Sequence, residues 1–243
     1  MKAVILAAGI GTRLKPITNN FPKCLVKVLN KPILQYQIES YLYAGIKDII
    51  IVTGYLSDKI EVFVQKKYFG IANIKIVYNK NFKTTNNMYS LYLTQFLLNE
   101  CFMVSNADVV IPLDMIKYIV TSEYENCIAV QKNNYNNESM KIKVDRNVIR
   151  TISKTINREN SYGTSIDIYC IGNTGKNKLF KIINEIIEIK KDKNLWTEVA
   201  INMLLSQINF YPLDIKDRYW YEIDNFEDLK KAEEIIKGKS CNE

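Results

Sequence analysis

The chain has 243 residues, 47% of them hydrophobic and 24% charged, which fits one soluble α/β domain. It contains no histidine, which excludes Ser-His-Asp and Cys-His catalysis, so any chemistry must use carboxylates, lysine, arginine and backbone donors. The net charge of +7 suggests nucleic-acid binding, but the lysines are dispersed, and a solvated basic surface without nucleic acid is the better interpretation.

The five cysteines are scattered and include no Cys-x-x-Cys pair, which argues against a disulfide framework or a zinc site. Cys241 is expected to be exposed near the terminus. No apolar run approaches the roughly 20 residues of a membrane span, and the start lacks a signal-peptide pattern. We therefore expect a cytoplasmic protein without membrane insertion. A homodimer is compatible with the sequence, which leaves the oligomeric state open.

The first 34 residues carry the densest functional pattern. A short apolar run, residues 3–6, predicts a buried strand, and a loop of small residues follows it and ends at Arg13. A second cation, Lys23, follows a proline. Small residues let phosphate approach backbone N–H groups, and the two cations can neutralise it. This combination indicates a nucleoside triphosphate site, with these loop residues as candidate contacts: Leu6, Ala7, Ala8, Gly9, Gly11 and Thr12.

Two common phosphate loops do not fit this segment. The Walker A pattern is absent. Gly9 and Gly11 supply two glycines of a Rossmann fingerprint, but Leu14 stands where the third should be, and Pro16 would interrupt the expected helix. A tight turn after a strand is the simplest alternative for the Gly-x-Gly pair alone.

The full pattern, from Leu6 through Arg13 to Pro22-Lys23 and Lys31-Pro32, resembles the signature of the nucleotidyltransferase family. The resemblance implies an enzyme that activates a sugar phosphate or alcohol phosphate with an NTP. It implies that Arg13 neutralises the β- and γ-phosphates and that Lys23 lies between the α-phosphate and the acceptor.

Alternating strands and helices follow and predict a parallel sheet covered on both faces. We expect a Rossmann-like, mixed but mainly parallel α/β sheet flanked by helices, with a small strand-rich insert that binds the acceptor. Gly54, after the second strand, is a further candidate nucleotide contact. The chain is expected to be one domain, 1–243, with an NTP-binding half (1–125), an acceptor-binding part (126–215) and a C-terminal part (216–243). Helices are expected at 32–44, 57–68, 88–98, 112–122, 176–190 and 196–205.

The polar loop 79–90 leads into a helix and offers Asn86 and Asn87 as readers of the nucleobase. A simple helix cap is an equally good interpretation of these asparagines. Sugar-1-phosphate nucleotidyltransferases usually carry a Gly-Thr-Ala element here, which is absent. The segment 85–92 instead resembles cytidylyltransferases for phosphocholine and related phosphoalkyl substrates, which favours CTP.

Two aspartates are candidate metal ligands. Asp108, with Ala107 before it, follows a buried strand at the edge where ligands bind parallel sheets. By the resemblance, Asp108 and the distant Asp224 hold Mg²⁺. A turn or helix-cap role is the alternative for each, and Asn225 could cap the last helix in place of Asp224. Residues 106–108 also resemble the Asp-x-Asp motif of glycosyltransferases, which would leave Arg13 and Lys23 unexplained.

Acceptor contacts are sought between residue 126 and the C-terminal segment. The resemblance places Lys132 and Lys154 at the acceptor phosphate, although each could equally be a surface lysine. Trp196 could stack on a quaternary ammonium or belong to the core. The relatives often read Gly-Glu-Ser-Ile-Gly where this chain has Gly-Thr-Ser-Ile-Asp at 163–167, which leaves the acceptor open. Glu198 and Glu222 complete the candidate acceptor set.

The resulting hypothesis is transfer of CMP from CTP to phosphocholine, 2-aminoethylphosphonate or another small phosphate, with release of pyrophosphate. Such products serve surface glycan or lipid decoration. The alternatives are a sugar-1-phosphate nucleotidyltransferase and a non-catalytic nucleotidyltransferase-like regulatory domain.

Overall fold

The first apolar run forms β1 (Lys2–Ala7), a central strand of a nine-stranded sheet. In this computed structural model, which describes residues 1–240, β1 pairs in parallel with β4 (Asp48–Thr53) and with β6 (Phe102–Asn106). The edge strand β5 (Asn73–Tyr78) pairs in parallel with β4. The carboxyl ends of these four strands therefore meet at one rim, where ligands bind in such sheets.

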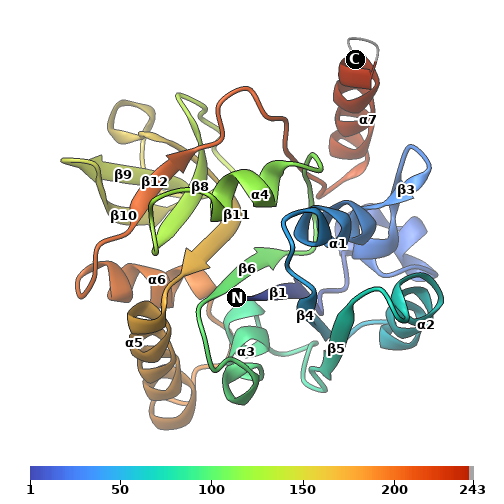
Figure 1. The fold of residues 1–243 in the computed structure, drawn as a ribbon, viewed down its shortest axis with the longest axis horizontal. Coiled ribbons are helices and arrows are strands. Elements are labelled where there is room, and N and C mark those ends of the chain that lie inside the picture. The colour runs from blue at the N-terminus through green and yellow to red at the C-terminus, as the bar shows by residue number, and fades with distance from the viewer. Residues whose placement is uncertain (241–243) are drawn as a thin grey trace.

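The second half of the chain adds mostly antiparallel strands to the same sheet, whose main path has the order β10-β9-β11-β6-β1-β4-β5. Its longest strand, β11 (Gly163–Ile171), pairs with β6, β9 and β8. The sheet is therefore mixed and flanked by helices, and the predicted fold class is confirmed (Figure 1). The remaining strands are β8 (Cys127–Lys132), β9 (Lys141–Asp145), β10 (Val148–Ser153) and β12 (Tyr211–Asp214).

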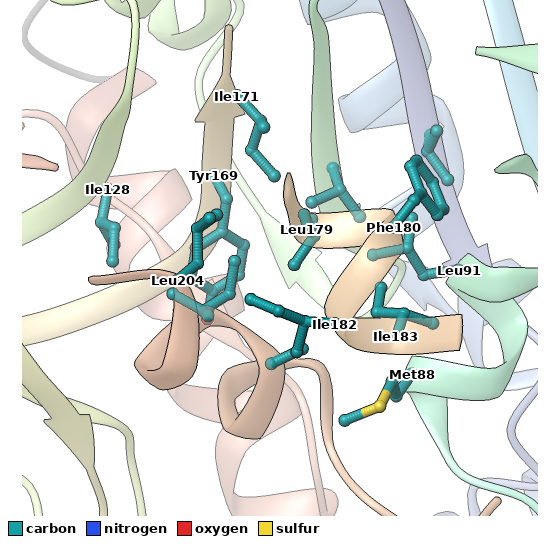
Figure 2. Packing of buried hydrophobic residues seen from close by; sticks show 14 of the residues in the cluster. Met88, Leu91, Ile128, Tyr169, Ile171, Leu179, Phe180, Ile182, Ile183 and Leu204 are labelled. Atoms are coloured by element: carbon teal, nitrogen blue, oxygen red, sulfur yellow. The ribbon is translucent and has the colours of Figure 1, made fainter. Parts of the chain in front are cut away.

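Alternate residues of β1 point to opposite faces, and each face has its own core. On one face, Val4 and Leu6 pack with α3 (Asn87–Tyr92), α5 (Asn173–Asn184) and α6 (Thr197–Leu205). Figure 2 shows this core, where side chains of α5 lie against Tyr169 and Ile171 of β11.

On the other face, Ala3 and Ile5 pack with three more helices. These are α1 (Ile33–Tyr43), α2 (Ser57–Tyr68) and α4 (Met115–Val120). A third, smaller cluster joins Leu14 and Val28 to α7 (Phe226–Ser240). Helices on both faces leave the strand ends as the open edge of the molecule.

Two very short strand pairs complete the described chain. One joins β2 (Lys27–Val28) to β3 (Lys31–Pro32), and the other joins β7 (Val109–Val110) to β13 (Tyr221–Glu222). Short 3₁₀ helices span Thr12–Leu14, Ile17–Asn19, Lys23–Leu25, Gln95–Leu97 and Arg158–Asn160.

Several expected helices are shorter in the structure. The helix expected over 88–98 ends at Tyr92, and the one expected over 112–122 begins at Met115. The helix expected over 176–190 changes at Glu185 into a π-helix, Glu185–Ile189. No helix among residues 1–240 is both long and apolar enough to cross a bilayer. Cys241 lies outside the described residues.

Candidate active site

The loop after β1 depends on two glycines, Gly11 within it and Gly54 packed against it. Gly11 has φ of 67°, and a Cβ there would lie 2.8 Å from Cβ of Lys23. A side chain at Gly11 would therefore be strained and would displace a site lysine. Gly54 is packed against the same loop, because a Cβ there would lie 2.7 Å from the carbonyl oxygen of Ala8. Gly54 thus supports the loop from behind and is not among the residues that line the cavity.

Lys23 lies between two carboxylates. Its Nζ donates to Oδ2 of Asp108 and to Oδ1 of Asp224, each at 2.7 Å. Burial alone would lower the pKa of Lys23, but the charges of Asp108 and Asp224 outweigh burial and raise it above the ordinary value. Lys23 is therefore a fixed cation. Arg13 adds a second, more exposed cation, with a guanidinium nitrogen 2.8 Å from Oδ1 of Asp224.

Asp108 and Asp224 are brought together by the backbone. The two-residue strands β7 and β13 pair antiparallel, with Glu222 opposite Val109. Beside this pair, the N–H of Ile223 donates to the carbonyl oxygen of Asp108 at 2.9 Å. The two aspartates therefore lie at one rim although they are far apart in the sequence.

The carboxylates of Asp108, Glu222 and Asp224 form a cluster whose ligand atoms lie within 4.8 Å of one another. Burial above all, with the neighbouring acidic groups Asp167, Asp108 and Asp224, raises the pKa of Glu222 to about 9. Burial would also raise the pKa of Asp224, but Lys23 and Arg13 lower it below the ordinary value. Oδ1 of Asp108 is buried and has no hydrogen-bond partner. An oxygen cluster with an unpartnered buried oxygen suits a hard divalent cation.

The helix-cap alternative for Asp224 is wrong. Asn225 caps α7, because its Oδ1 accepts from the N–H of Asp228 at 3.0 Å. Asp228 in turn accepts from the N–H groups of Asp224 and Asn225. This reciprocal cap leaves the carboxylate of Asp224 for the cations.

A cavity of about 380 Å³ opens above this cluster. It brings together most of the predicted nucleotide contacts and both aspartates. The predicted residues that line it are Leu6, Ala7, Ala8, Gly9, Gly11, Thr12, Arg13, Lys23, Asn86, Asn87, Ala107, Asp108, Trp196, Glu222 and Asp224.

Asn86 and Asn87 have structural partners as well as a place in the cavity. Asn86 is the N-cap of α3, and its side chain accepts from the N–H of Asn87 at 2.8 Å. Asn87 accepts from the N–H of Thr197 at 2.8 Å and thereby ties α3 to α6. Base reading by either residue stays a prediction.

The predicted acceptor residues divide into two groups. Trp196 and Glu222 line the cavity, and Trp196, with 45% exposure, is not a core residue. Lys132, Lys154 and Glu198 do not line it. Lys132 lies over the ring of Tyr162, and Lys154 lies 5.1 Å above the ring of Trp196. Glu198 is buried behind the wall, where Tyr169 donates to it at 2.8 Å.

The sequence interpretation omitted several residues that line the cavity. Four of them come from the loop 79–90, where the run of polar residues was a signal, although only two asparagines were selected. Asn106 stands beside Asp108 in the same short motif. The omitted residues are Cys24, Asn79, Phe82, Thr85, Ser90 and Asn106.

Comparison with known proteins identifies the family of this chain. Residues 2–238 match the nucleotidyl transferase family model. The chain belongs to the nucleotidyl transferase family. It is 31% identical over 241 residues to a choline-phosphate cytidylyltransferase of Streptococcus pneumoniae, covering 99% of this chain and all of the relative. It is 34% identical over 138 residues to a CTP:phosphoglutamine cytidylyltransferase of Campylobacter jejuni, which covers 54% of this chain and 53% of that protein.

The solved structures agree. A CTP:phosphocholine cytidylyltransferase from Streptococcus pneumoniae superposes with a TM-score of 0.77 and 27% identity, over 97% of this chain and 98% of that one. Mannose-1-phosphate guanylyltransferases are also among the relatives of this family member. The predicted family, with cytidylyltransferases as close relatives, is confirmed.

Proposed function

We propose that this family member transfers CMP from CTP to a small acceptor that carries a phosphate or phosphonate, with release of pyrophosphate. The observation that carries the proposal is the position of Lys23, a fixed cation between Asp108 and Asp224 at the foot of the small-residue loop. The choice of CTP is supported by the cytidylyltransferase relatives.

The reaction is an in-line displacement. An oxygen of the acceptor phosphate attacks the α-phosphorus, the bond between that phosphorus and the oxygen bridging to the β-phosphate breaks, and pyrophosphate leaves with the electron pair. The backbone donors of residues 8–12 hold the nucleotide, and Arg13 neutralises the β- and γ-phosphates. Lys23 neutralises the charge that develops between the α-phosphate and the acceptor. Positioning and charge neutralisation are sufficient for such a transfer without a protein nucleophile.

The carboxylate cluster fits Mg²⁺. Asp108 and Asp224 would hold the ion, and the unpartnered oxygen of Asp108 offers it a free ligand atom. A bound Mg²⁺ would supply Lewis-acid neutralisation of phosphate oxygens. The ammonium of Lys23 balances the charge of the same carboxylates.

Two classes of acceptor are supported by the cavity and by the relatives. Trp196 offers an aromatic face at the cavity wall, which suits an ammonium such as that of phosphocholine. A sugar-1-phosphate acceptor is the second candidate, because guanylyltransferases for mannose-1-phosphate are among the relatives. A non-catalytic role would not require Arg13, Lys23 and both aspartates together.

The experiment is a screen of ATP, CTP, GTP and UTP against phosphocholine, 2-aminoethylphosphonate, phosphoglutamine, glucose-1-phosphate and mannose-1-phosphate. Pyrophosphate release is the readout, in the presence of Mg²⁺. We expect the fastest release with CTP and a non-sugar phosphate. Preference for a sugar-1-phosphate with another NTP would replace the proposal by the second candidate, and no release in any pair would favour the non-catalytic domain.

A further inference from the structure

A closed circuit of hydrogen bonds lies behind one wall of the cavity. The Nδ2 of Asn87 lies 3.4 Å from Oδ1 of Asn106, whose own Nδ2 donates to Oδ2 of Asp167 at 3.0 Å. The hydroxyl oxygen of Tyr169 lies 3.2 Å from Oδ1 of Asp167 and 2.8 Å from Oε1 of Glu198. Thr197, the neighbour of Glu198 in the chain, closes the circuit because its N–H donates to Oδ1 of Asn87. The circuit therefore links α3, β6, β11 and α6.

Asp167 occupies the least favourable backbone position in this circuit. Its φ is 57°, in the left-handed region, where the pairing of β11 with β8 is irregular between Ser165 and Tyr169. Glycine adopts this region most easily, and aspartate and asparagine tolerate it better than other side chains do. An aspartate at a backbone position that suits glycine indicates that the aspartate side chain has a function.

The hydrogen count at Tyr169 determines the state of Asp167. The phenol carries one hydrogen but lies near two carboxyl groups. We assign that hydrogen to the shorter contact, to Glu198. Asp167 must then supply its own hydrogen to the phenol oxygen, because two acceptors cannot bond to each other. Burial, together with the charges of Glu198 and Asp108, raises the pKa of Asp167 to about 7, although hydrogen bonds donated by Asn106 and Tyr169 would lower it.

The groups around Asp167 favour its neutral form. The charged groups that act on its pKa, Glu198 and Asp108, are acidic, whereas Lys154 lowers the pKa of Glu198. A further negative charge at Asp167 would be repelled by these neighbours. The titratable groups around the circuit are Asp108 after β6, Glu198 in α6, Glu222 in β13, Tyr169 in β11 and Lys154.

We propose that Asp167, in its neutral, proton-bearing form, is a positioning residue that fixes the acceptor wall of the cavity to its nucleotide side. This inference rests on the proposed cytidylyl transfer. Asn87 and Asn106 line the cavity, as does Trp196 at the start of α6. Asp167 joins these elements by donating to Tyr169 and accepting from Asn106. Loss of the circuit would free the first turn of α6, and with it the Trp196 face, to move away from the acceptor.

Two substitutions separate this role from a merely structural one. Both Asp167→Asn and Asp167→Gly tolerate the left-handed backbone. The asparagine amide can donate to Tyr169 and accept from Asn106, as the neutral aspartic acid does, whereas glycine removes both bonds. We expect Asp167→Asn to keep kcat/KM within about threefold of the wild type. Asp167→Gly should lose roughly tenfold or more, as is typical when a residue supporting a site is removed.

Comparing the KM for the acceptor with the KM for the nucleotide shows whether Asp167 positions the acceptor. In Asp167→Gly we expect most of the loss as a higher KM for the acceptor, with the KM for the nucleotide nearly unchanged. The assay uses the NTP and acceptor that the screen above finds best, so that a wrong choice of CTP or phosphocholine does not decide this question. An Asp167→Asn enzyme as impaired as Asp167→Gly would show that the charge is needed and would overturn the proposal. Wild-type kinetics in Asp167→Gly would overturn it as well.

A melting experiment without substrate tests the proton itself. The pKa of Asp167 is higher in the folded chain than the ordinary value of 3.8, so the folded state binds more protons between about pH 4 and about pH 7. This contribution to stability is present at low pH and is lost as the pH rises through that window. Asp167→Asn lacks it, so its Tm relative to the wild type should rise steadily from pH 4 to above pH 7. A Tm difference independent of pH would contradict the neutral state even if the enzyme proved inactive with CTP.

Discussion

Asp108 and Asp224 share one ammonium group: each accepts a 2.7 Å hydrogen bond from Nζ of Lys23. The β7–β13 pair fixes the two backbones beside each other, and the small-residue loop and the Lys23 turn bring the cation to them. One lysine therefore balances a cluster of carboxylates at the place where a triphosphate would bind. The predictions below follow from this arrangement.

Lys23→Ala should reduce kcat by about 10²–10³-fold, the usual effect of removing a group that stabilises developing charge. It should also lower the stability of the metal-free protein by about 2 kcal/mol, because two charge-assisted hydrogen bonds are lost. Added Mg²⁺ should restore part of that stability, since the freed carboxylates gain another cation. Turnover by pyrophosphate release and Tm with and without Mg²⁺ measure both effects. Lys67→Ala, on the exposed surface of α2, is the matched control. Near-normal turnover in Lys23→Ala would exclude the mechanism.

Asp224→Asn and Asp108→Asn should each reduce Mg²⁺-dependent turnover by about 10²-fold or more, because a metal ligand contributes several kcal/mol of charge stabilisation. The rise in Tm that Mg²⁺ causes in the wild type should shrink in both variants, because a ligand stabilises only the state that binds it. Asp58→Asn, an exposed carboxylate in the first turn of α2, should leave the metal response unchanged. A full Mg²⁺ response in both site variants would place the metal elsewhere.

Gly54→Ala tests the packing that supports the loop, and Gly9→Ala tests the contact between the loop and the nucleotide. A Cβ at Gly54 would lie 2.6 Å from Cβ of Phe82, so overpacking should lower stability by about 1–3 kcal/mol. A Cβ at Gly9 meets nothing within 4 Å, and Gly9 lines the cavity. Gly9→Ala should therefore fold normally but raise the KM for the nucleotide. Thermal melts and nucleotide kinetics on both variants give the comparison, and an unchanged nucleotide KM in Gly9→Ala would argue against close approach at that residue.

Trp196→Ala should raise the KM for phosphocholine about tenfold, the size of effect expected for a cation–π contact of about 1–2 kcal/mol. The KM for CTP should change less, because the proposed phosphate contacts are the small-residue loop, Arg13 and Lys23 and do not include Trp196. Phe96→Ala removes an aromatic ring that is 91% exposed outside the site and serves as the control. Equal increases in both KM values would indicate a general disturbance of the cavity instead.

Much of this fold could be predicted from sequence because its strands are apolar runs with clear boundaries. The apolar run expected as a strand over residues 3–6 forms β1, and the helices expected at 32–44, 57–68 and 196–205 appear within a residue of those bounds. The two-residue strands β7 and β13 could not be predicted, since so short a pair has no periodic pattern. That pair nonetheless determines how Asp108 and Asp224 meet.

Site residues could be predicted where they share one short sequence motif. They could not be predicted where contacts between distant parts of the chain decide which residues reach the site. The small-residue loop, Arg13 and Lys23 lie in one short segment, and the structure brings them together at the cavity. Lys132 and Lys154 were selected by resemblance, but the folded insert places both outside the lining. In the sequence, Asp167 is only a departure from the pattern of the relatives. Its contacts with Asn106 and Tyr169 form because β6 and β11 pair in the folded chain.

The most direct test of the central claim is ³¹P NMR of the purified wild-type protein with CTP, Mg²⁺ and the best acceptor of the screen. Transfer of CMP predicts two mutually coupled resonances of a new diphosphate ester, in a one-to-one ratio with pyrophosphate, and Lys23→Ala should slow the formation of both products by about 10²–10³-fold. Formation of CMP or inorganic phosphate without the coupled pair, or an unchanged spectrum of CTP with every acceptor, would contradict the account.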